Sequence, residues 1–181
     1  MMLLSYGEKT PNLHESVFVA SGVKIIGEVT AGKDSNIWYN SVLRGDVAPI
    51  TIGEEVNIQD GTVIHTSRFN GGCTIGNRVT IGHICLLHAC SLHDDSFIGM
   101  GSVIMDKVVV ETFGFVAAGS LVTPGKIIKS GELWAGSPAK FVRKITDQET
   151  FLIKDTPTHY IKLANLHKSS NPAVNITMMG R

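Results

Sequence analysis

The sequence has no excess of charge of either sign, because 16 Lys and Arg residues balance 16 Asp and Glu residues. Phosphate binding needs clustered Lys and Arg, and no basic stripe is present, so we expect no nucleic-acid partner. Apolar runs of membrane-spanning length are also missing, which argues against membrane insertion. The first residues, "MMLLSYGEKTPN", lack the basic start, apolar stretch and small-residue cleavage site of a secretory signal. We therefore expect a soluble protein of the cytoplasm.

Cysteine is scarce as well, with three residues and no CxxC spacing. An odd number in a reducing compartment predicts free thiols rather than a disulfide framework. Cys85 and Cys90 neighbour histidines, but we expect each cysteine to be a small buried residue rather than a metal ligand. What the chain has instead is 43% hydrophobic residues over 181 positions, enough for one domain with a substantial core.

Aliphatic residues recur at every sixth position through most of the chain. They occupy Val19, Ile25, Ala31, Ile37 and Leu43, then Ile52, Ile58 and Ile64, then Ile75, Ile81 and Leu87, and finally Leu92, Ile98, Ile104, Val110, Val116 and Val122. A small or β-branched residue follows four positions after nearly every one of them. A period of six matches neither the 3.6-residue helix nor the two-residue strand.

Six residues are enough for one short strand and one tight turn, and three such units close a triangular coil of about 18 residues. The recurring aliphatic residues then fill the interior, and small residues let the corners turn. We therefore predict an all-β solenoid, a parallel β-helix of hexapeptide repeats, over residues 1–145. Thr146 can cap a helix that begins at Asp147, and "THYIKLANLHK" indicates a second helical stretch. We expect this C-terminal α-helical segment, residues 146–170, to pack on the β-helix, and residues 171–181 to form a tail.

Two histidines lie five residues apart in "TIGHICLLHAC", a spacing that suits neither a helix face nor a strand face. Counting repeats explains it. If Ile64 to Ile75 is one repeat plus a five-residue loop around "SRFNGG", His65 and His88 occupy equivalent positions on one face, one coil or about 4.8 Å apart. The alternative count, two repeats minus one residue, would separate them.

The same count places the polar residues nearby. Arg44 lies one coil before His65 on the same face, whereas His83 lies on another face, above Asp60 and beside Gln59. His83 therefore cannot easily turn toward His65, but a neighbouring chain could supply it if three chains pack about a threefold axis. Three neutral histidines plus water are a standard catalytic zinc arrangement, and imidazoles accept Fe²⁺ or Co²⁺ as well.

The stretches "RGDVAPITIGEEVNIQDGTVIH", "TIGHICLLHAC" and "GSPAK" resemble the gamma-class carbonic anhydrase family, over roughly residues 15 to 145. The resemblance implies a left-handed β-helix and a homotrimer with metal sites shared between subunits. It implies His65 and His88 as metal ligands from one subunit and His83 from its neighbour.

The resemblance also implies a role for each of four polar residues. Arg44 and Asp46 match the family's intersubunit ion pair, Gln59 the residue that hydrogen-bonds the metal-bound hydroxide, and Asp60 a residue that orients a histidine. The implied enzyme is a lyase that reversibly hydrates carbon dioxide to bicarbonate by means of that hydroxide.

The chain departs from the family pattern where acidic loops are expected to move protons. Val47 follows Asp46 directly, and the loop after His65 has no carboxylate. His93 and Tyr160 are therefore considered as further site residues. Two other readings stay open: an acyltransferase or thioesterase acting on a coenzyme A thioester with a histidine as general base, and a metal-binding homologue without turnover.

Overall fold

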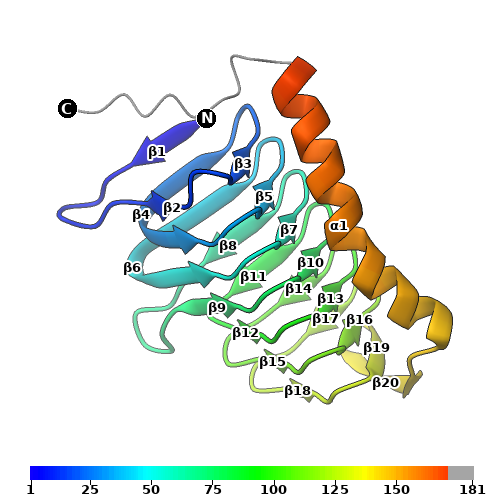
Figure 1. The fold of residues 1–181 in the computed structure, drawn as a ribbon. Coiled ribbons are helices and arrows are strands. Elements are labelled where there is room, and N and C mark those ends of the chain that lie inside the picture. Colours follow the sequence, from blue (N-terminus) through cyan, green and yellow to red (C-terminus); the bar gives the residue numbers. More distant parts are fainter. Residues whose placement is uncertain (171–181) are drawn as a thin grey trace.

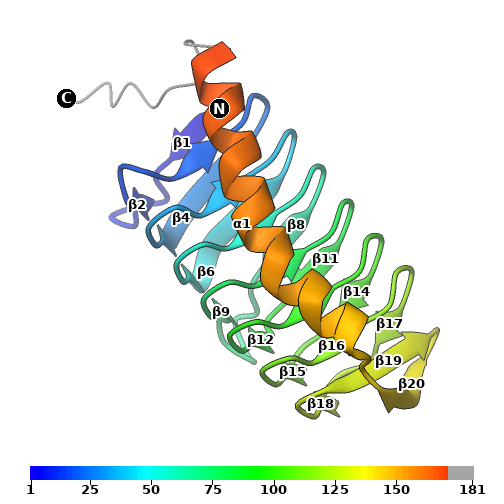
Figure 2. The same cartoon turned by 45° about the vertical axis from the view of Figure 1, so that its right-hand side comes forward.

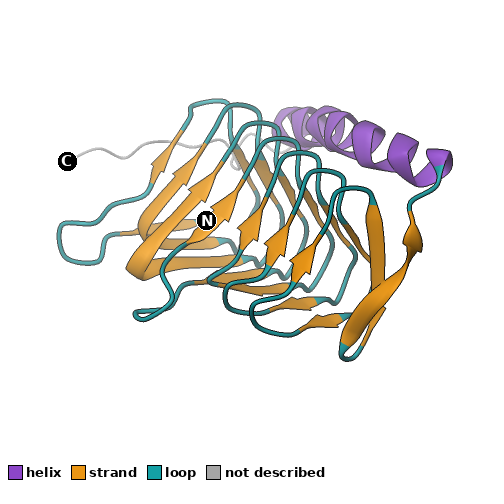
Figure 3. Cartoon of the chain, turned by 90° about the horizontal axis from the view of Figure 1, so that it is seen from below, coloured by secondary structure: helices purple, strands orange, loops and turns teal. Residues whose placement is uncertain are grey.

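Parallel strands stack coil upon coil into a three-sided solenoid in the computed structural model, which describes residues 1–170 (Figure 1). One long helix lies outside one of the three sides, as the view from below shows (Figure 3). The predicted tail, residues 171–181, lies outside the described residues.

The strands form a 12-stranded and an 8-stranded sheet. The larger sheet covers two sides, because β4 and β6 continue around a corner from one side to the next. What we call the first face contains β1 (Met2–Leu4), the start of β4 (Lys24–Ala31), the start of β6 (Val42–Ile52), β8 (Val63–His65), β11 (Leu86–His88), β14 (Val103–Ile104) and β17 (Leu121–Val122).

The second face contains β2 (Asn12–Leu13), the ends of β4 and β6, β9 (Cys73–Ile75), β12 (Ser91–Leu92), β15 (Val109–Val110) and β18 (Ile127–Ile128). The third face contains β3 (Phe18–Val19), β5 (Asn36–Ile37), β7 (Asn57–Ile58), β10 (Thr80–Ile81), β13 (Phe97–Ile98), β16 (Phe115–Val116), β19 (Glu132–Gly136) and β20 (Ala139–Lys144). The last two strands pair antiparallel and end the solenoid.

The register confirms the way in which the repeats were counted. Ile52 pairs with Ile75 on the second face, and Ile64 pairs with Leu87 on the first. The segment after β8 is therefore an extra loop, closed by an antiparallel bridge between Ser67 and Gly71. The three surplus residues before Ile52 appear as a bulge, because the pairing of β4 with β6 shifts in register there.

The interior consists of the recurring aliphatic residues. Every predicted interior position, from Val19 to Val122, is at most 5% exposed. These side chains pack on their equivalents in neighbouring coils, so the core is a continuous column. Cys73, Cys85 and Cys90 are buried with free thiols.

The C-terminal segment is one continuous helix, α1 (Asp147–Ser170), rather than two helical stretches. Its start is capped reciprocally: the amide of Glu149 donates to Thr146 Oγ1 (3.2 Å), and the amide of Thr146 donates to Glu149 Oε2 (2.8 Å). Pro157 lies inside the helix, where it costs one backbone hydrogen bond, but it is buried. Packing of the helix on the solenoid outweighs that local cost.

The helix runs back along the third face toward the N-terminal coils (Figures 1 and 2). Near its end, Lys168 Nζ donates to the carbonyl of Ser16 (2.6 Å), and His167 shares a hydrogen bond with the hydroxyl of Tyr39 (2.9 Å). Among residues 1–170, no helix is long and apolar enough to cross a membrane.

Candidate metal centre

His65 and His88 pair directly across neighbouring coils of the first face. Nδ1 of His65 lies 3.2 Å from Nε2 of His88, and the ring centroids are 5.2 Å apart. Both side chains are partly exposed, at 20% and 35%. The predicted stacking of these two residues is therefore confirmed, and the two rings share an accessible surface.

A carboxylate holds each ring from the opposite side. Asp46 Oδ1 accepts from His65 Nε2 (3.1 Å), and Asp106 Oδ1 accepts from His88 Nδ1 (2.6 Å). Each neutral imidazole has one N–H, which it donates to a carboxylate. The two nitrogens that face one another therefore both carry lone pairs. Two facing lone pairs require a shared proton or a cation between them.

The facing nitrogens fit a metal ion. Two ligand nitrogens of a tetrahedral zinc, each about 2.0–2.1 Å from the metal, are about 3.3 Å apart. The 3.2 Å between His65 Nδ1 and His88 Nε2 is close to that value. Asp46 and Asp106 would then fix the tautomers and ring orientations of the ligands, as carboxylates commonly do behind metal-bound histidines.

Both carboxylates stay ionised near neutral pH. Asn70 Nδ2 donates to Asp106 (2.8 Å), and this hydrogen bond together with that of His88 lowers the pKa of Asp106. Burial alone would raise the pKa of Asp46, but hydrogen bonds from His65 and Arg44 outweigh burial and lower it. The ion pair of Arg44 and Asp46, which the resemblance places between subunits, forms within one chain in this structure.

Asp46 reaches His65 because of the bulge in β6. Gly27 pairs with Gly45, but Val29 pairs with Ile50, so the segment 46–49 is looped out of the ladder. The amide of Val47 donates to Asp46 Oδ1 (2.9 Å) and fixes the carboxylate at the start of this bulge. The bulge that the irregular repeat spacing produces therefore places Asp46 beside His65.

His83 lies away from this pair, at the corner between β10 and β11. Its Nδ1 is 2.9 Å from Asp60 Oδ2, which leaves Nε2 open, and 40% of the side chain is exposed. A side chain at Gly82 would meet the backbone of Met100, with 2.5 Å between its Cβ and the amide nitrogen, so the coils approach closely beside His83. Within residues 1–170, no three His, Cys, Asp or Glu side chains gather closely enough to hold a metal ion.

Gln59 directly follows β7 on the third face, one coil below Gly82, the neighbour of His83, and it is 6% exposed. Its Nε2 donates to Asn57 Oδ1 (2.8 Å), and within the described residues its Oε1 has no hydrogen-bond partner. The carbonyl oxygen is thus the free polar atom of this side chain. Gln59 lies beside His83 as the repeat count predicts. Its hydrogen bond to Asn57 could not be predicted from that count.

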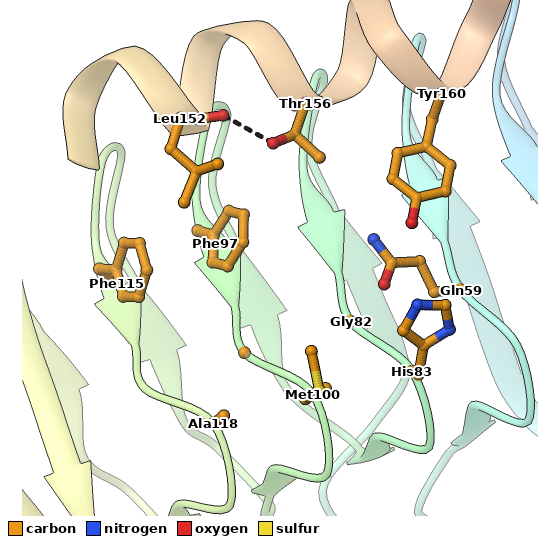
Figure 4. A pocket seen from close by; sticks show the side chains of 11 residues that line it. Gln59, Gly82, His83, Phe97, Met100, Phe115, Ala118, Leu152, Thr156 and Tyr160 are labelled. Carbon is orange, nitrogen blue, oxygen red and sulfur yellow. Dashed lines mark hydrogen bonds between the residues drawn. The ribbon is translucent and has the colours of Figure 1, made fainter. Parts of the chain in front are cut away.

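A pocket of about 350 Å³ between α1 and the third face ends at Gln59 and His83 (Figure 4). Its walls are mostly apolar and include Phe97 and Phe115, whose rings stack with centroids 4.6 Å apart. Tyr160 reaches into it from α1 and points toward Gln59. Burial and the negative charge of Asp60 raise the pKa of Tyr160, so its hydroxyl stays protonated.

Tyr160 thus lines the pocket beside Gln59, whereas His93 follows β12 on the second face and does not line it. Sequence reasoning missed Asp106 and Asn70. One signal was present: Asp106 lies two residues after Ile104 on the first face, one coil beyond His88, and no packing role requires a carboxylate there. The partner, Asn70, comes from the inserted loop, whose conformation the repeat does not specify.

Fold and site together define a hexapeptide-repeat β-helix protein with histidines placed between neighbouring coils. No protein-family model matches the chain. It is 46% identical over 174 residues to Gamma carbonic anhydrase 2, mitochondrial, of Arabidopsis thaliana, covering 93% of this chain and 63% of that protein. It is 40% identical over 168 residues to a carbonic anhydrase of Geobacillus kaustophilus, covering 93% and 92%.

Among solved structures, a hexapeptide transferase family protein from Anaplasma phagocytophilum matches with a TM-score of 0.88 and 49% identity, covering 91% of this chain and 97% of that one. The chain belongs to the gamma-class carbonic anhydrase family, and its solenoid is the left-handed parallel β-helix of hexapeptide-repeat proteins. It spans only 63% of the length of that Arabidopsis relative and of Gamma carbonic anhydrase 1, mitochondrial, of the same plant.

Proposed function

We propose that the protein is a metal-dependent carbonic anhydrase that reversibly hydrates carbon dioxide at a site shared between subunits of a homotrimer. The observation that carries this proposal is the pair of facing nitrogens on His65 and His88, each backed by a carboxylate. His83 of a neighbouring chain completes the set. Zn²⁺ is the metal we expect, and Fe²⁺ or Co²⁺ suit the same ligands.

The surface around the histidines supports contact with another chain. Val63 and Leu86 are 38% and 41% exposed on the first face beside His65 and His88, and Ile84 next to His83 is 74% exposed. Large apolar side chains that flank polar residues on the surface are typical of protein interfaces. A threefold arrangement buries Val63 and Leu86 together with Ile84, because the first face of one chain meets the corner beside His83 of the next chain.

A metal ion with three neutral imidazole ligands lowers the pKa of water to about 7 and so supplies a nucleophile at neutral pH. With such a metal bound, Gln59 Oε1 would accept a hydrogen bond from the nucleophile and orient it toward the substrate. The apolar walls of the pocket suit carbon dioxide, which carries no net dipole, and exclude competing water. Asp60 holds His83, and Arg44 keeps Asp46 ionised behind His65.

Subunit mixing tests the shared site. His65→Ala, His83→Ala and His88→Ala should each abolish metal binding in the homotrimer without unfolding it, because the core is aliphatic. Co-expression of His65→Ala with His83→Ala chains should restore about a quarter of the sites, since some interfaces combine the intact side of each.

The matched control is His65→Ala mixed with His88→Ala, which should restore none, because both changes lie on the same side of the interface. His93→Ala should keep full metal content. Restoration in the control, or a monomer that binds one metal per chain, would contradict the arrangement.

Two further points complete the proposal. The expected compartment is the cytoplasm, which cell fractionation would test, since the Arabidopsis relatives are named mitochondrial. Release of coenzyme A is the assay for the alternative, an acyltransferase or thioesterase. If metal-loaded protein hydrates no carbon dioxide but cleaves an acyl thioester, an acyl-handling function replaces our proposal.

A further inference from the structure

A row of buried hydrogen bonds leads from Trp38 to Gln59 along the third face. Trp38 Nε1 donates to Asn36 Oδ1 (2.8 Å), Asn57 Nδ2 donates to the same Oδ1 (2.6 Å), and Gln59 Nε2 donates to Asn57 Oδ1 (2.8 Å). Asn36 and Asn57 are fully buried, and Trp38 is 5% exposed. We call these four side chains the amide row.

The amide row has a direction, and the strong hydrogen bond from Trp38 sets it. An amide can turn over and exchange its donor for its acceptor, but an indole N–H can only donate. Asn36 must therefore present its oxygen to Trp38. A bond from Asn36 Nδ2 to the carbonyl of Asp34 agrees with this orientation, but at 3.5 Å it is long and weak.

The direction passes from one amide to the next. Because Asn36 offers an oxygen, Asn57 must offer its Nδ2, and its Oδ1 then accepts from Gln59. Gln59 is left with its carbonyl oxygen free toward the pocket. If the row were reversed, Gln59 would present its amino group there, and the pocket would have a donor where it now has an acceptor.

We propose that Trp38 is a positioning residue, whose indole N–H fixes the amide orientation of Gln59 and so decides that the site offers an acceptor. The catalytic part of this inference rests on the proposed function, in which Gln59 orients the attacking nucleophile. The orientation itself does not. Trp38 also packs against Tyr160 and His167 of α1, with ring centroids 5.4 and 5.0 Å away, so it joins the docked helix to the row.

A stability cycle tests the row without any activity. Above pH 7, Gln59→Glu offers Asn57 only acceptor oxygens, so Asn57 would have to turn its Nδ2 toward residue 59 and Asn36 would have to turn its Nδ2 toward Asn57. That turn removes the acceptor of the Trp38 N–H, so Trp38 opposes it, and adding Trp38→Phe removes the conflict. The thermal shift of the double variant should therefore be smaller than the sum of the two single shifts.

Trp134→Phe is the matched control, because the only other tryptophan donates its N–H to Glu132 (2.9 Å) outside the row. Its shift should add to that of Gln59→Glu. Additive shifts for Trp38→Phe as well would make Trp38 a packing residue and overturn the proposal. Should Trp38→Phe not fold, hydrogen exchange in the unaltered protein decides: rapid exchange of the Trp38 indole proton would exclude the row.

An activity cycle then tests the consequence. Trp38→Phe should lower kcat/KM for hydration several-fold with metal content and trimer unchanged, and it should have no further effect in a Gln59→Ala background. Equal losses in both backgrounds would show that Trp38 acts other than through Gln59. If the protein hydrates no carbon dioxide at all, the proposed function fails, while the stability cycle still decides the role of Trp38.

Discussion

His65 Nδ1 and His88 Nε2 face one another across 3.2 Å, and the other nitrogen of each ring donates to a carboxylate. Two nitrogens at this distance would hold a metal ion between them. The carboxylates behind the rings would then help to set the metal affinity by orienting the rings.

The first prediction concerns Asp106. Asp106→Asn removes the charge that fixes the tautomer of His88, and it should weaken metal affinity about 10- to 100-fold while leaving the β-helix folded. Competition with a chelator of known affinity measures the change. Glu111→Gln is the control, since Glu111 binds Lys129 on the second face and should not matter. Unchanged affinity in Asp106→Asn would mean that Asp106 only secures the loop through Asn70.

The second prediction concerns Ile84, a β-branched residue with φ of +57° that is 74% exposed. The backbone strain of such a residue in the left-handed region lowers the stability of the fold by about 1–2 kcal/mol. An exposed side chain makes no contacts that offset this strain. Ile84→Gly should therefore stabilise each chain's fold but weaken the trimer, because an interface contact is lost.

Sedimentation over a range of dilutions measures that loss. The control is Asp34→Gly, at another corner with φ of +57°, which should stabilise the fold and leave the trimer unchanged. If Ile84→Gly associates as tightly as the unaltered chain, the corner beside His83 is not part of the interface.

The sequence predicts the path of the backbone well, because the interior of a β-helix accepts one kind of residue at one period. Ile64 and Leu87 could thus be placed on one face before any coordinates, and His65 and His88 followed from them. Asp106 and Asn57 could not be placed in the same way. Their roles depend on hydrogen bonds between side chains of different coils, and a six-residue period does not encode which polar atoms meet.

The third prediction concerns the acid stability of the α1 cap. The guanidinium of Arg143, together with Thr146, lowers the pKa of Glu149 from 4.5 to about 2. A carboxyl with a lowered folded pKa contributes stability above its unfolded pKa, and this is lost as the pH falls through the folded value. The stability advantage over Glu149→Gln should be full above pH 5 and vanish near pH 2. Thermal unfolding against pH measures it; an advantage that persists at pH 2 would contradict the pairing.

The fourth prediction concerns proton transfer during turnover. A group that moves protons between the site and water near neutrality needs a pKa near 7. Hydrogen bonds lower the pKa of Asp46 and Asp106, and burial raises that of Tyr160, so the pKa values of these three groups near the site are all shifted away from 7. Hydration should therefore be slow in dilute buffer and rise several-fold with added imidazole, which carries the proton itself.

Gln59→Ala should lower kcat/KM at every buffer concentration with metal content unchanged, because Gln59 acts on the attack of the nucleophile rather than on proton transfer. Fast turnover independent of buffer would show that the chain has its own proton path, and Tyr160→Phe would be the first variant to test.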